Sequence, residues 1–262
     1  MSNICVFGDS FAGFDIRPEL EHTHWIGKLK KHFSGYNNPN QLVLTSMGGS
    51  GPMDHINQFY KHLPQVNNSD ILIFVWSQSS RLFHSNPEIR DISVGTCLHK
   101  DHRLYPSNSK RDKLYELALR YYEEFYYEKN EEIKMVGMLQ WFDRVLLENY
   151  SNKKIFHFQS FSTCQENGQK NLQDQVLYHK FKSGINVGPP LMYLSENEPD
   201  FSSLGIKDKR AGHLNQDNHN LVFQKLVQEW DKNKGDTILL DDNYKPTYTL
   251  DYYSKFWKDL WR

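Results

Sequence analysis

The sequence predicts an α/β fold in which a parallel sheet is covered by helices on both faces. Three short apolar segments, 4–7, 42–44 and 70–76, each end in a loop of small residues. Helical patterns lie between them, and this alternation of strand and helix is typical of a doubly wound parallel sheet. A chain of 262 residues is long enough to form one such domain with a substantial core. We therefore expect a three-layer α/β/α sandwich.

The first strand is expected at residues 4–7, directly before Gly8, Asp9 and Ser10. An apolar run that ends in turn-forming residues is typical of a buried parallel strand. Ligands of open α/β sheets bind outside the carboxyl ends of the strands. Ser10 therefore carries a hydroxyl to the edge where chemistry is expected. Asp9 is interpreted as a turn residue whose side chain binds backbone amides.

The next elements follow the same rhythm of strands and helices. Apolar residues at helical spacing predict one helix over 25–33 and another over 53–63. Between them, a short strand at 42–44 ends in a glycine-rich segment. The strongest strand signal, 70–76, ends in a loop of small polar residues. The carboxyl ends of these strands are expected to meet at one edge of the sheet.

The second half of the chain adds helices and a fourth strand. Residues 109–149 have a helical pattern, and 154–159 read as a strand that again ends in a polar loop. Residues 166–207 are rich in Asn, Gln, Gly, Ser and Pro, and we expect loops with short helical pieces there. A last core helix is expected over 216–230.

The domain organisation follows from these patterns. We expect one domain over 1–234, with a helical elaboration at about 109–149. Residues 235–262 hold a short apolar run and an aromatic end, and we expect them to form a C-terminal extension packed on the domain. The sequence shows no internal repeat and no low-complexity segment.

Composition limits the classes of function. Lys plus Arg number 31 against 32 Asp plus Glu, so a formal net charge of -1 provides no basic field for nucleic acid. Three scattered cysteines, and histidines without ligand spacing, indicate neither a disulfide framework nor a metal site. Histidines such as His24 and His55 are interpreted as surface residues, and His219 as a helix-face residue. We expect no cofactor.

The sequence also gives expectations about location and partners. It begins without a secretory signal pattern, and no apolar stretch approaches the ~20 residues that span a bilayer. We therefore expect a cytoplasmic protein with neither a membrane nor a nucleic-acid partner. The sequence does not predict an oligomeric state.

The chemistry expected at the sheet edge is acyl transfer. It needs a nucleophile, a base within hydrogen-bond reach and donors aimed at the developing oxyanion. Ser10 is the candidate nucleophile, and His213 is the candidate base because it directly precedes the last core helix. Backbone N–H groups of Ser10 and of the segment 48–51 are candidate oxyanion donors, since glycine lets the main chain approach closely.

Four short motifs support this interpretation through their order and spacing. They are Gly8-Asp9-Ser10, Ser46-Met47-Gly48-Gly49-Ser50, Trp76-Ser77-Gln78-Ser79-Ser80-Arg81 and Gly212-His213-Leu214-Asn215. Each directly follows an expected strand or precedes an expected helix. Together they resemble the four sequence blocks of the SGNH (GDSL-type) hydrolases. The third motif is similar to the form found in a divergent bacteriophage branch of that family.

The resemblance implies the SGNH hydrolase fold, with a flavodoxin-like sheet, and a serine esterase. Ser10 would be the nucleophile, and His213 would deprotonate it and later protonate the leaving alcohol. The N–H groups of Ser10 and Gly49 would stabilise the oxyanion, with Gly48 as the alternative register. The expected substrate is a carboxylic ester of a small molecule or glycan, such as an O-acetyl group. An aromatic content of 14% suits a glycan-binding surface.

Two positions depart from the family pattern. The oxyanion asparagine of the family would fall near Ser79, but the loop contains no Asn. The side-chain amide of Gln78 is the favoured replacement, and a serine hydroxyl of the same loop is the alternative. The acid of the family would stand at Arg210, and the nearest carboxylate is Asp208. The alternative to Asp208 is a backbone carbonyl that orients the imidazole of His213.

Roles are also expected for two arginines, and the sequence supports a second hypothesis about function. Arg81 and Arg210 are interpreted as structural partners of Asp208, with binding of an acidic substrate group as the alternative. The two departures favour a second hypothesis, in which a catalytically inactive module binds glycan or has a structural role in a phage particle and is virion-associated. A nucleotide-binding protein is compatible with the expected sheet, but this sequence has no phosphate-binding glycine motif after the first strand.

Overall fold

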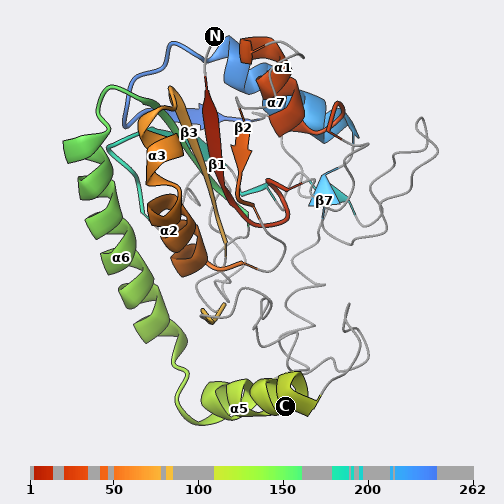
Figure 1. Cartoon of the computed structure of the whole chain (residues 1–262), viewed down its shortest axis with the longest axis vertical. Coiled ribbons are helices and arrows are strands. Elements are labelled where there is room, and N and C mark those ends of the chain that lie inside the picture. Colours follow the sequence, from red (N-terminus) through yellow and green to blue (C-terminus); the bar gives the residue numbers. More distant parts are fainter. Residues whose placement is uncertain are drawn as a thin grey trace.

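The computed structural model describes residues 3–13, 21–34, 42–46, 50–77, 81–84, 109–160, 179–188, 190–191, 195–196, 213–214 and 216–240. Its centre is a six-stranded sheet with the strand order β2-β1-β3-β4-β5-β8, in which every pair is parallel (Figure 1). The strands are β1 (Ile4–Gly8), β2 (Leu42–Leu44), β3 (Ile71–Trp76), β4 (Lys154–Gln159), β5 (Ile185–Gly188) and β8 (Thr237–Leu239). The expected α/β fold with a flavodoxin-like sheet is confirmed.

Two strands of the sheet depart from the sequence expectations. Residues 166–207 were expected to form loops and short helical pieces, but β5 lies among them and pairs with β4. β8, which falls in the expected C-terminal extension, is the edge strand of the sheet, with Thr237 opposite Asn186. A separate antiparallel pair joins β6 (Ser195–Glu196) to β7 (His213–Leu214).

The central strands are apolar along their whole length because both faces of the sheet are covered. Every residue of β1 and β3 is buried. In β1, Ile4 and Val6 join the apolar cluster on one face, whereas Cys5 and Phe7 join the cluster on the other. A continuous apolar run of this kind is therefore the sequence signature of a strand with two dry faces.

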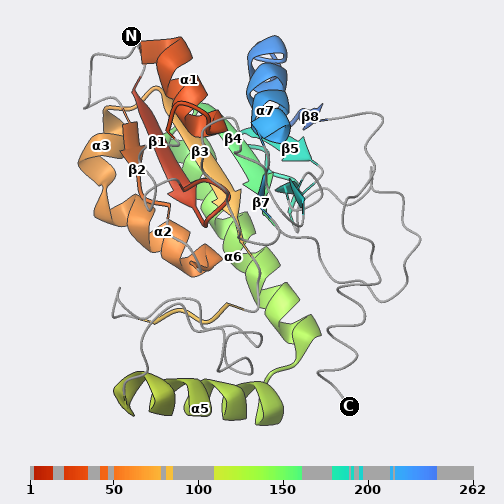
Figure 2. The same ribbon diagram turned by 90° about the vertical axis from the view of Figure 1, so that its right-hand side faces the viewer.

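The helices form the two outer layers of the sandwich. On one face lie α1 (Trp25–Ser34) and α7 (Gln216–Gln228), which contact each other (Figure 2). On the other face lie α2 (Pro52–Lys61), α3 (Leu63–Asn67) and α6 (Glu128–Asn149). Their apolar residues complete the two core clusters on the two sides of the sheet.

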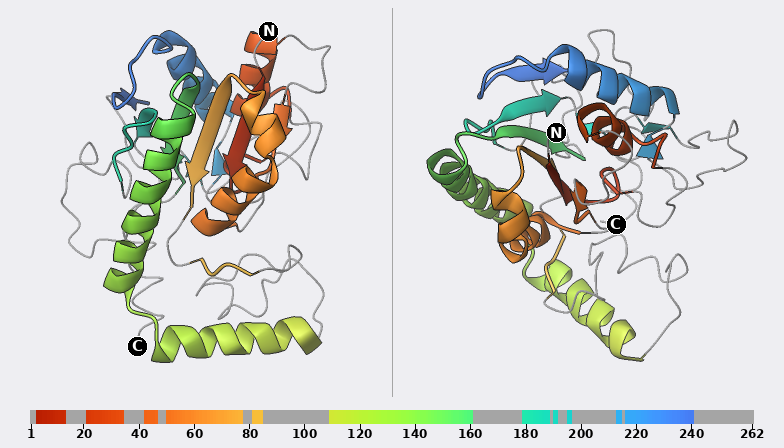
Figure 3. Two further views of the ribbon diagram at one scale, coloured as in Figure 1. Left: turned by 60° about the vertical axis from the view of Figure 1, so that its left-hand side comes forward. Right: turned by 45° about the horizontal axis from the view of Figure 1, so that its top comes forward.

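α5 (Ser109–Glu124) is the helix that does not cover the sheet. It lies beyond the carboxyl ends of the strands, and α6 extends past the sheet to meet it (Figure 3). Tyr115, Ala118 and Tyr122 form a small cluster of their own, against which Leu82 packs. α5 and α6 together occupy the region where the sequence predicts helix. Of the helices described, none is both long enough and apolar enough to cross a lipid bilayer.

The topology selects one edge of the sheet for function. β1 lies between β2 and β3, so the chain leaves β1 toward one side and then crosses to the other. In open α/β sheets such a switch point opens a crevice at the carboxyl ends of the strands, where ligands bind. The residues that directly follow β1, β2 and β3 stand at this edge, and Ser10 is among them.

Candidate active site

Ser10 is presented by a rigid turn at the end of β1. It is the one residue between positions 4 and 13 that is not buried. The turn is closed by a hydrogen bond from Ala12 N to Asp9 O at 3.1 Å. Phe11 and Ala12 then return the chain to the core. The fold therefore leaves this serine partly exposed while it buries its neighbours on both sides.

Asp9 holds the turn from inside the protein. Its side chain is fully buried, and Oδ1 accepts hydrogen bonds from Phe11 N at 3.0 Å and from Ser160 Oγ at 2.8 Å. The contact to the amide two residues ahead is an Asx turn, which fits the expected structural role of Asp9. Ser160 directly follows β4, so Asp9 links the ends of two strands.

Arg81 links three loops at the same edge. Its Nη1 lies 3.9 Å from Asp9 Oδ2 and donates a hydrogen bond to Ser50 O at 3.2 Å. These contacts connect the segments that follow β1, β2 and β3. Arg81 thus has a structural partner, Asp9, that the sequence interpretation did not name.

Burial shifts the pKa values of two side chains at this edge, Asp9 and His55. Burial raises the pKa of the Asp9 carboxyl. The Arg81 charge and the hydrogen bonds from Phe11 and Ser160 lower this pKa, but burial outweighs them. The nearby Ser77 hydroxyl also lowers this pKa, although it makes no hydrogen bond of regular geometry among the described residues. Burial, and secondly the charge of Arg81, lower the pKa of His55 to about 3, so its ring is neutral at neutral pH.

A buried serine–histidine pair lies beside the turn. Ser50 Oγ donates a hydrogen bond to Gly8 O at 3.0 Å and lies 3.0 Å from Nε2 of His55. On the other side of residues 47–49, Thr45 N donates to Val6 O at 3.0 Å. A residue on each side of the glycine segment is therefore hydrogen-bonded to β1.

Sequence reasoning missed this pair because it treated the histidines as surface residues. That interpretation is wrong for His55 and His24, which are buried. His55 belongs to the inner face of α2, together with Ile56 and Phe59. A histidine at apolar spacing, directly after a glycine-rich loop, is the signal that could have identified it.

The candidate base is described through its backbone alone. His213 lies in β7 opposite Glu196. Its neighbour Leu214 belongs to the same apolar cluster as Phe11 and Ala12, which follow Ser10. A contact between Ser10 and His213 stays a prediction. The other predicted site residues lie outside the described residues: Gly48, Gly49, Gln78, Ser79, Asp208 and Arg210.

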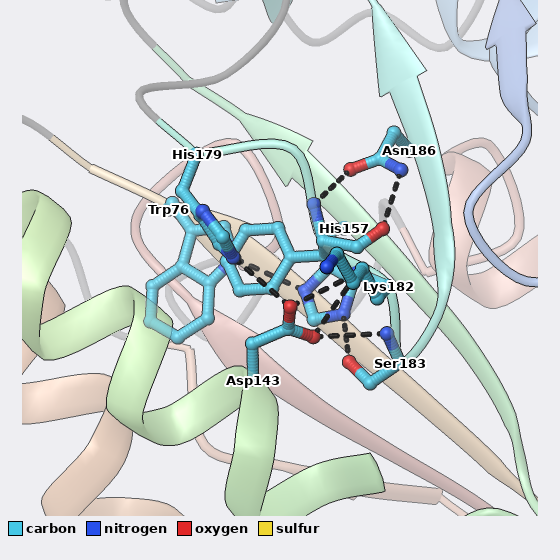
Figure 4. Close-up of polar contacts among 8 residues, drawn as sticks. Trp76, Asp143, His157, His179, Lys182, Ser183 and Asn186 are labelled. Carbon is cyan, nitrogen blue, oxygen red and sulfur yellow. Dashed lines mark hydrogen bonds and ion pairs between the residues drawn. The ribbon is translucent and has the colours of Figure 1, made fainter.

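A second buried polar cluster, which the sequence did not predict, surrounds Asp143 of α6 (Figure 4). The carboxylate accepts hydrogen bonds from Lys182 N at 2.9 Å and Ser183 N at 2.9 Å, and His179 Nε2 lies 2.9 Å from Oδ2. Burial raises the pKa of Asp143, but these contacts, with the Ser183 hydroxyl, outweigh it and lower the pKa below its ordinary value. The cluster therefore holds a stable anion.

His157 of β4 connects this cluster to Trp76 of the neighbouring strand β3. Its Nδ1 accepts a hydrogen bond from Trp76 Nε1 at 3.2 Å, and its Nε2 lies 3.2 Å from Ser183 Oγ. Its ring stacks on Phe181 with the centroids 3.7 Å apart. Burial lowers the pKa of His157 to about 3. None of the buried side-chain N or O atoms of Asp143, His157 and Ser183 lacks a hydrogen-bond partner, so these residues join α6 to β4 and to the segment before β5 as a structural network.

The described residues offer no evident cation site. Among them, no three His, Cys, Asp or Glu side chains converge as metal ligands. At the carboxyl edge the carboxylate of Asp9 faces Arg81 and hydroxyl groups instead.

Comparison with known proteins gives no family for this chain. It matches no protein-family model, no curated protein sequence and no solved structure. The resemblance to the SGNH hydrolases therefore rests on the four sequence motifs. What the fold adds is the place of the first and third motifs, which stand side by side at the ends of β1 and β3.

Proposed function

We propose that the protein is a serine esterase with Ser10 as its nucleophile. The observation that supports this most is the partial exposure of Ser10 within a buried segment at the switch point of the sheet. A nucleophile must reach the substrate while its backbone is held in place. The Asx turn of Asp9 and its contact with Ser160 supply the rigid backbone.

The proposed general base is His213, immediately before α7. Ser10 Oγ attacks the carbonyl carbon of the ester as its proton passes to His213. The tetrahedral intermediate then expels the alcohol, which takes that proton from His213. A water molecule, deprotonated by His213, attacks the acyl-enzyme. The second tetrahedral intermediate then releases the acid as Ser10 Oγ takes the proton back from His213. Asp208 or a backbone carbonyl would orient the imidazole.

The proposed oxyanion donors are the N–H groups of Ser10 and Gly49, with Gly48 as the alternative, and the amide of Gln78. Support comes from the anchors beside the glycine segment, since Thr45 and Ser50 both bind carbonyl oxygens of β1. Loss of one such donor typically costs about 3 kcal/mol of transition-state stabilisation. The substrate class that we propose is a carboxylic ester, such as an acetyl ester of a glycan.

Labelling with a fluorophosphonate probe tests the nucleophile without knowledge of the substrate. We expect the wild-type protein to be labelled and to hydrolyse p-nitrophenyl acetate, and Ser10→Ala to lose both properties with an unchanged circular dichroism spectrum. Ser151→Ala is the matched control, because Ser151 is exposed in a turn far from Ser10 in sequence. Absence of labelling and hydrolysis in the wild type would refute the esterase. It would favour the inactive glycan-binding or structural module.

A further inference from the structure

We infer that His55 is a positioning residue that acts through Ser50 to hold the turn of the nucleophile against the amino end of α2. The inference rests on the proposed function, because it assigns a role within that reaction. Ser50 ends the second motif, but neither its side chain nor that of His55 has a role in the proposed reaction.

The imidazole of His55 comes from a fixed element. His55 lies in α2, with its backbone N–H bonded to Gly51 O at 3.3 Å, and the Asp54 carboxylate accepts from Gly51 N at 2.8 Å. Its ring is 1% exposed and packs 5.9 Å from the Trp76 ring, centroid to centroid. The start of α2 is therefore closed by its own hydrogen bonds, and His55 projects from it into the core.

The hydrogen bonds determine which nitrogen of His55 carries the proton. A serine hydroxyl has one proton, and here Ser50 Oγ donates it to Gly8 O. In its contact with His55 the oxygen is then the acceptor, so Nε2 carries a proton and donates to Ser50. Nδ1 is bare in the neutral ring. The donation runs in one direction, from His55 through Ser50 to the carbonyl of Gly8.

This arrangement is not a second nucleophile with its base. Ser50 is 3% exposed and its proton is engaged by a backbone carbonyl. A substrate carbonyl has no route to an oxygen buried in this way. A serine–histidine pair that is closed to solvent and bonded to the backbone can still fix the position of other groups.

What the pair fixes is the place of the nucleophile turn relative to α2. The carbonyl of Gly8 lies in the peptide directly before Asp9, so its hydrogen bond holds one side of the turn that presents Ser10. The carbonyl of Ser50 is in turn held by Arg81. One hydroxyl thus couples the nucleophile turn to the start of α2 and to Arg81. A displacement of about 1 Å in such a site can cost about 100-fold in rate.

Substitutions at the two positions separate a positioning role from a general structural role. We expect Ser50→Ala and His55→Met to lower kcat for p-nitrophenyl acetate by about 10- to 100-fold, with KM changed by less than about threefold. His55→Gln keeps an N–H donor near the position of Nε2, and we expect it to recover most of the lost kcat. The matched control is Ser69→Ala, which removes an equally buried hydroxyl bonded to Val66 O before the amino end of β3. Its kcat should stay at the wild-type value.

The outcomes distinguish this inference from the proposed function. If the wild type is labelled at Ser10 but Ser50→Ala and His55→Met keep full kcat, the positioning role is refuted and the esterase stands. Equal losses in His55→Gln and His55→Met, or an equal loss in Ser69→Ala, also refute it. If the wild type is neither labelled nor active, the esterase and this inference both fall.

Should the variants not fold, the wild-type protein still tests the hydrogen-bond direction. Nitrogen-15 NMR distinguishes the two neutral tautomers of histidine. We expect His55 to be neutral at pH 7 with its proton on Nε2. A proton on Nδ1 would overturn the inference, because His55 could then not donate to Ser50.

Discussion

Asp9 and Asp143 are both buried carboxylates, but their surroundings move their pKa values in opposite directions. Burial raises the pKa of Asp9, whereas hydrogen bonds outweigh burial and lower the pKa of Asp143. Asp9 lies at the carboxyl edge of the sheet beside Ser10. Asp143 lies on α6, where it binds the segment that precedes β5. Each has a buried neutral histidine nearby, His55 and His157 respectively.

The difference lies in how the two oxygens of each carboxylate are used. Oδ1 of Asp9 accepts both of the hydrogen bonds that this carboxylate receives. Oδ2 accepts none from the described residues and lies 3.9 Å from Nη1 of Arg81. Both oxygens of Asp143 accept hydrogen bonds, and the donors include two backbone N–H groups. Within the described part of the chain, the Asp143 cluster is thus complete, whereas Asp9 Oδ2 has only Arg81 and the Ser77 hydroxyl near it.

Incomplete pairing concentrates at the edge where function is proposed. Several buried side-chain atoms lack a hydrogen-bond partner within the described part of the chain: Asp9 Oδ2, Ser46 Oγ, His55 Nδ1 and Ser77 Oγ. They come from α2 or from segments that directly follow β1, β2 and β3. Buried polar groups are normally satisfied, and exceptions gather at functional sites. Within the described residues, the complete network around Asp143 joins elements of the fold, whereas the unpaired atoms lie at the edge where function is proposed.

The largest predicted effect is the loss of the Asp143 charge. Asp143→Asn should lower the free energy of unfolding by about 3 kcal/mol, because an amide group in either orientation turns N–H groups toward existing donors. Asp9→Asn should cost only about 1 kcal/mol, since Oδ1 keeps both hydrogen bonds and the amide takes the place of the unbonded Oδ2. Urea denaturation of the two variants measures the difference. Equal losses would contradict the comparison.

The sequence predicted the sheet well because its central strands must be apolar on both faces. β1 and β3 appear as uninterrupted apolar runs for that reason. β5 escaped prediction since it has four residues and includes Asn186. Both polar atoms of that side chain are satisfied by the backbone of Phe181, a contact that periodicity does not reveal.

The site was predictable only in part. The position of Ser10 at a strand end and the turn contact of Asp9 were predictable, because both follow from the local sequence. The contacts of Asp9 with Ser160, and of Asp143 with Ser183, join residues far apart in sequence. Nothing in the local pattern reports such contacts. The burial of His55 likewise depends on how α2 packs on the sheet, not on the identity of the residue.

The next prediction concerns the loss of stability in acid. An unfolded histidine takes up a proton near its ordinary pKa of 6.5, whereas His55 and His157 stay neutral until about pH 3. The unfolded state therefore binds more protons in this window, and stability falls as the pH drops below 6.5. Each histidine lowers the folding equilibrium constant by about tenfold per pH unit once its unfolded form is charged. His157→Gln should remove one such contribution.

The carboxylates modify this pH profile in opposite senses. The raised pKa of Asp9 lets the native state hold a proton at higher pH, so its contribution is present in acid and is lost as the pH rises through the native pKa. Asp143 has a lowered pKa, so its contribution is present above 3.8 and is lost as the pH falls through the native pKa. Urea denaturation from about pH 4.5 to about 7 should show a steeper acid loss for Asp9→Asn and a shallower one for His157→Gln. Unchanged slopes would contradict these assignments.

The smallest predicted difference compares one serine from each cluster. Ser183→Ala should cost about 2 kcal/mol, because it leaves the buried Nε2–H of His157 without its acceptor and removes a hydroxyl from Asp143. Ser160→Ala should cost about 1 kcal/mol, since Asp9 Oδ1 keeps its bond from Phe11 N. Both serines are buried, so the loss of contact area is matched. A larger loss for Ser160→Ala, measured by urea denaturation at pH 7, would mean that the Asp9 cluster contributes more to stability than its unpaired atoms indicate.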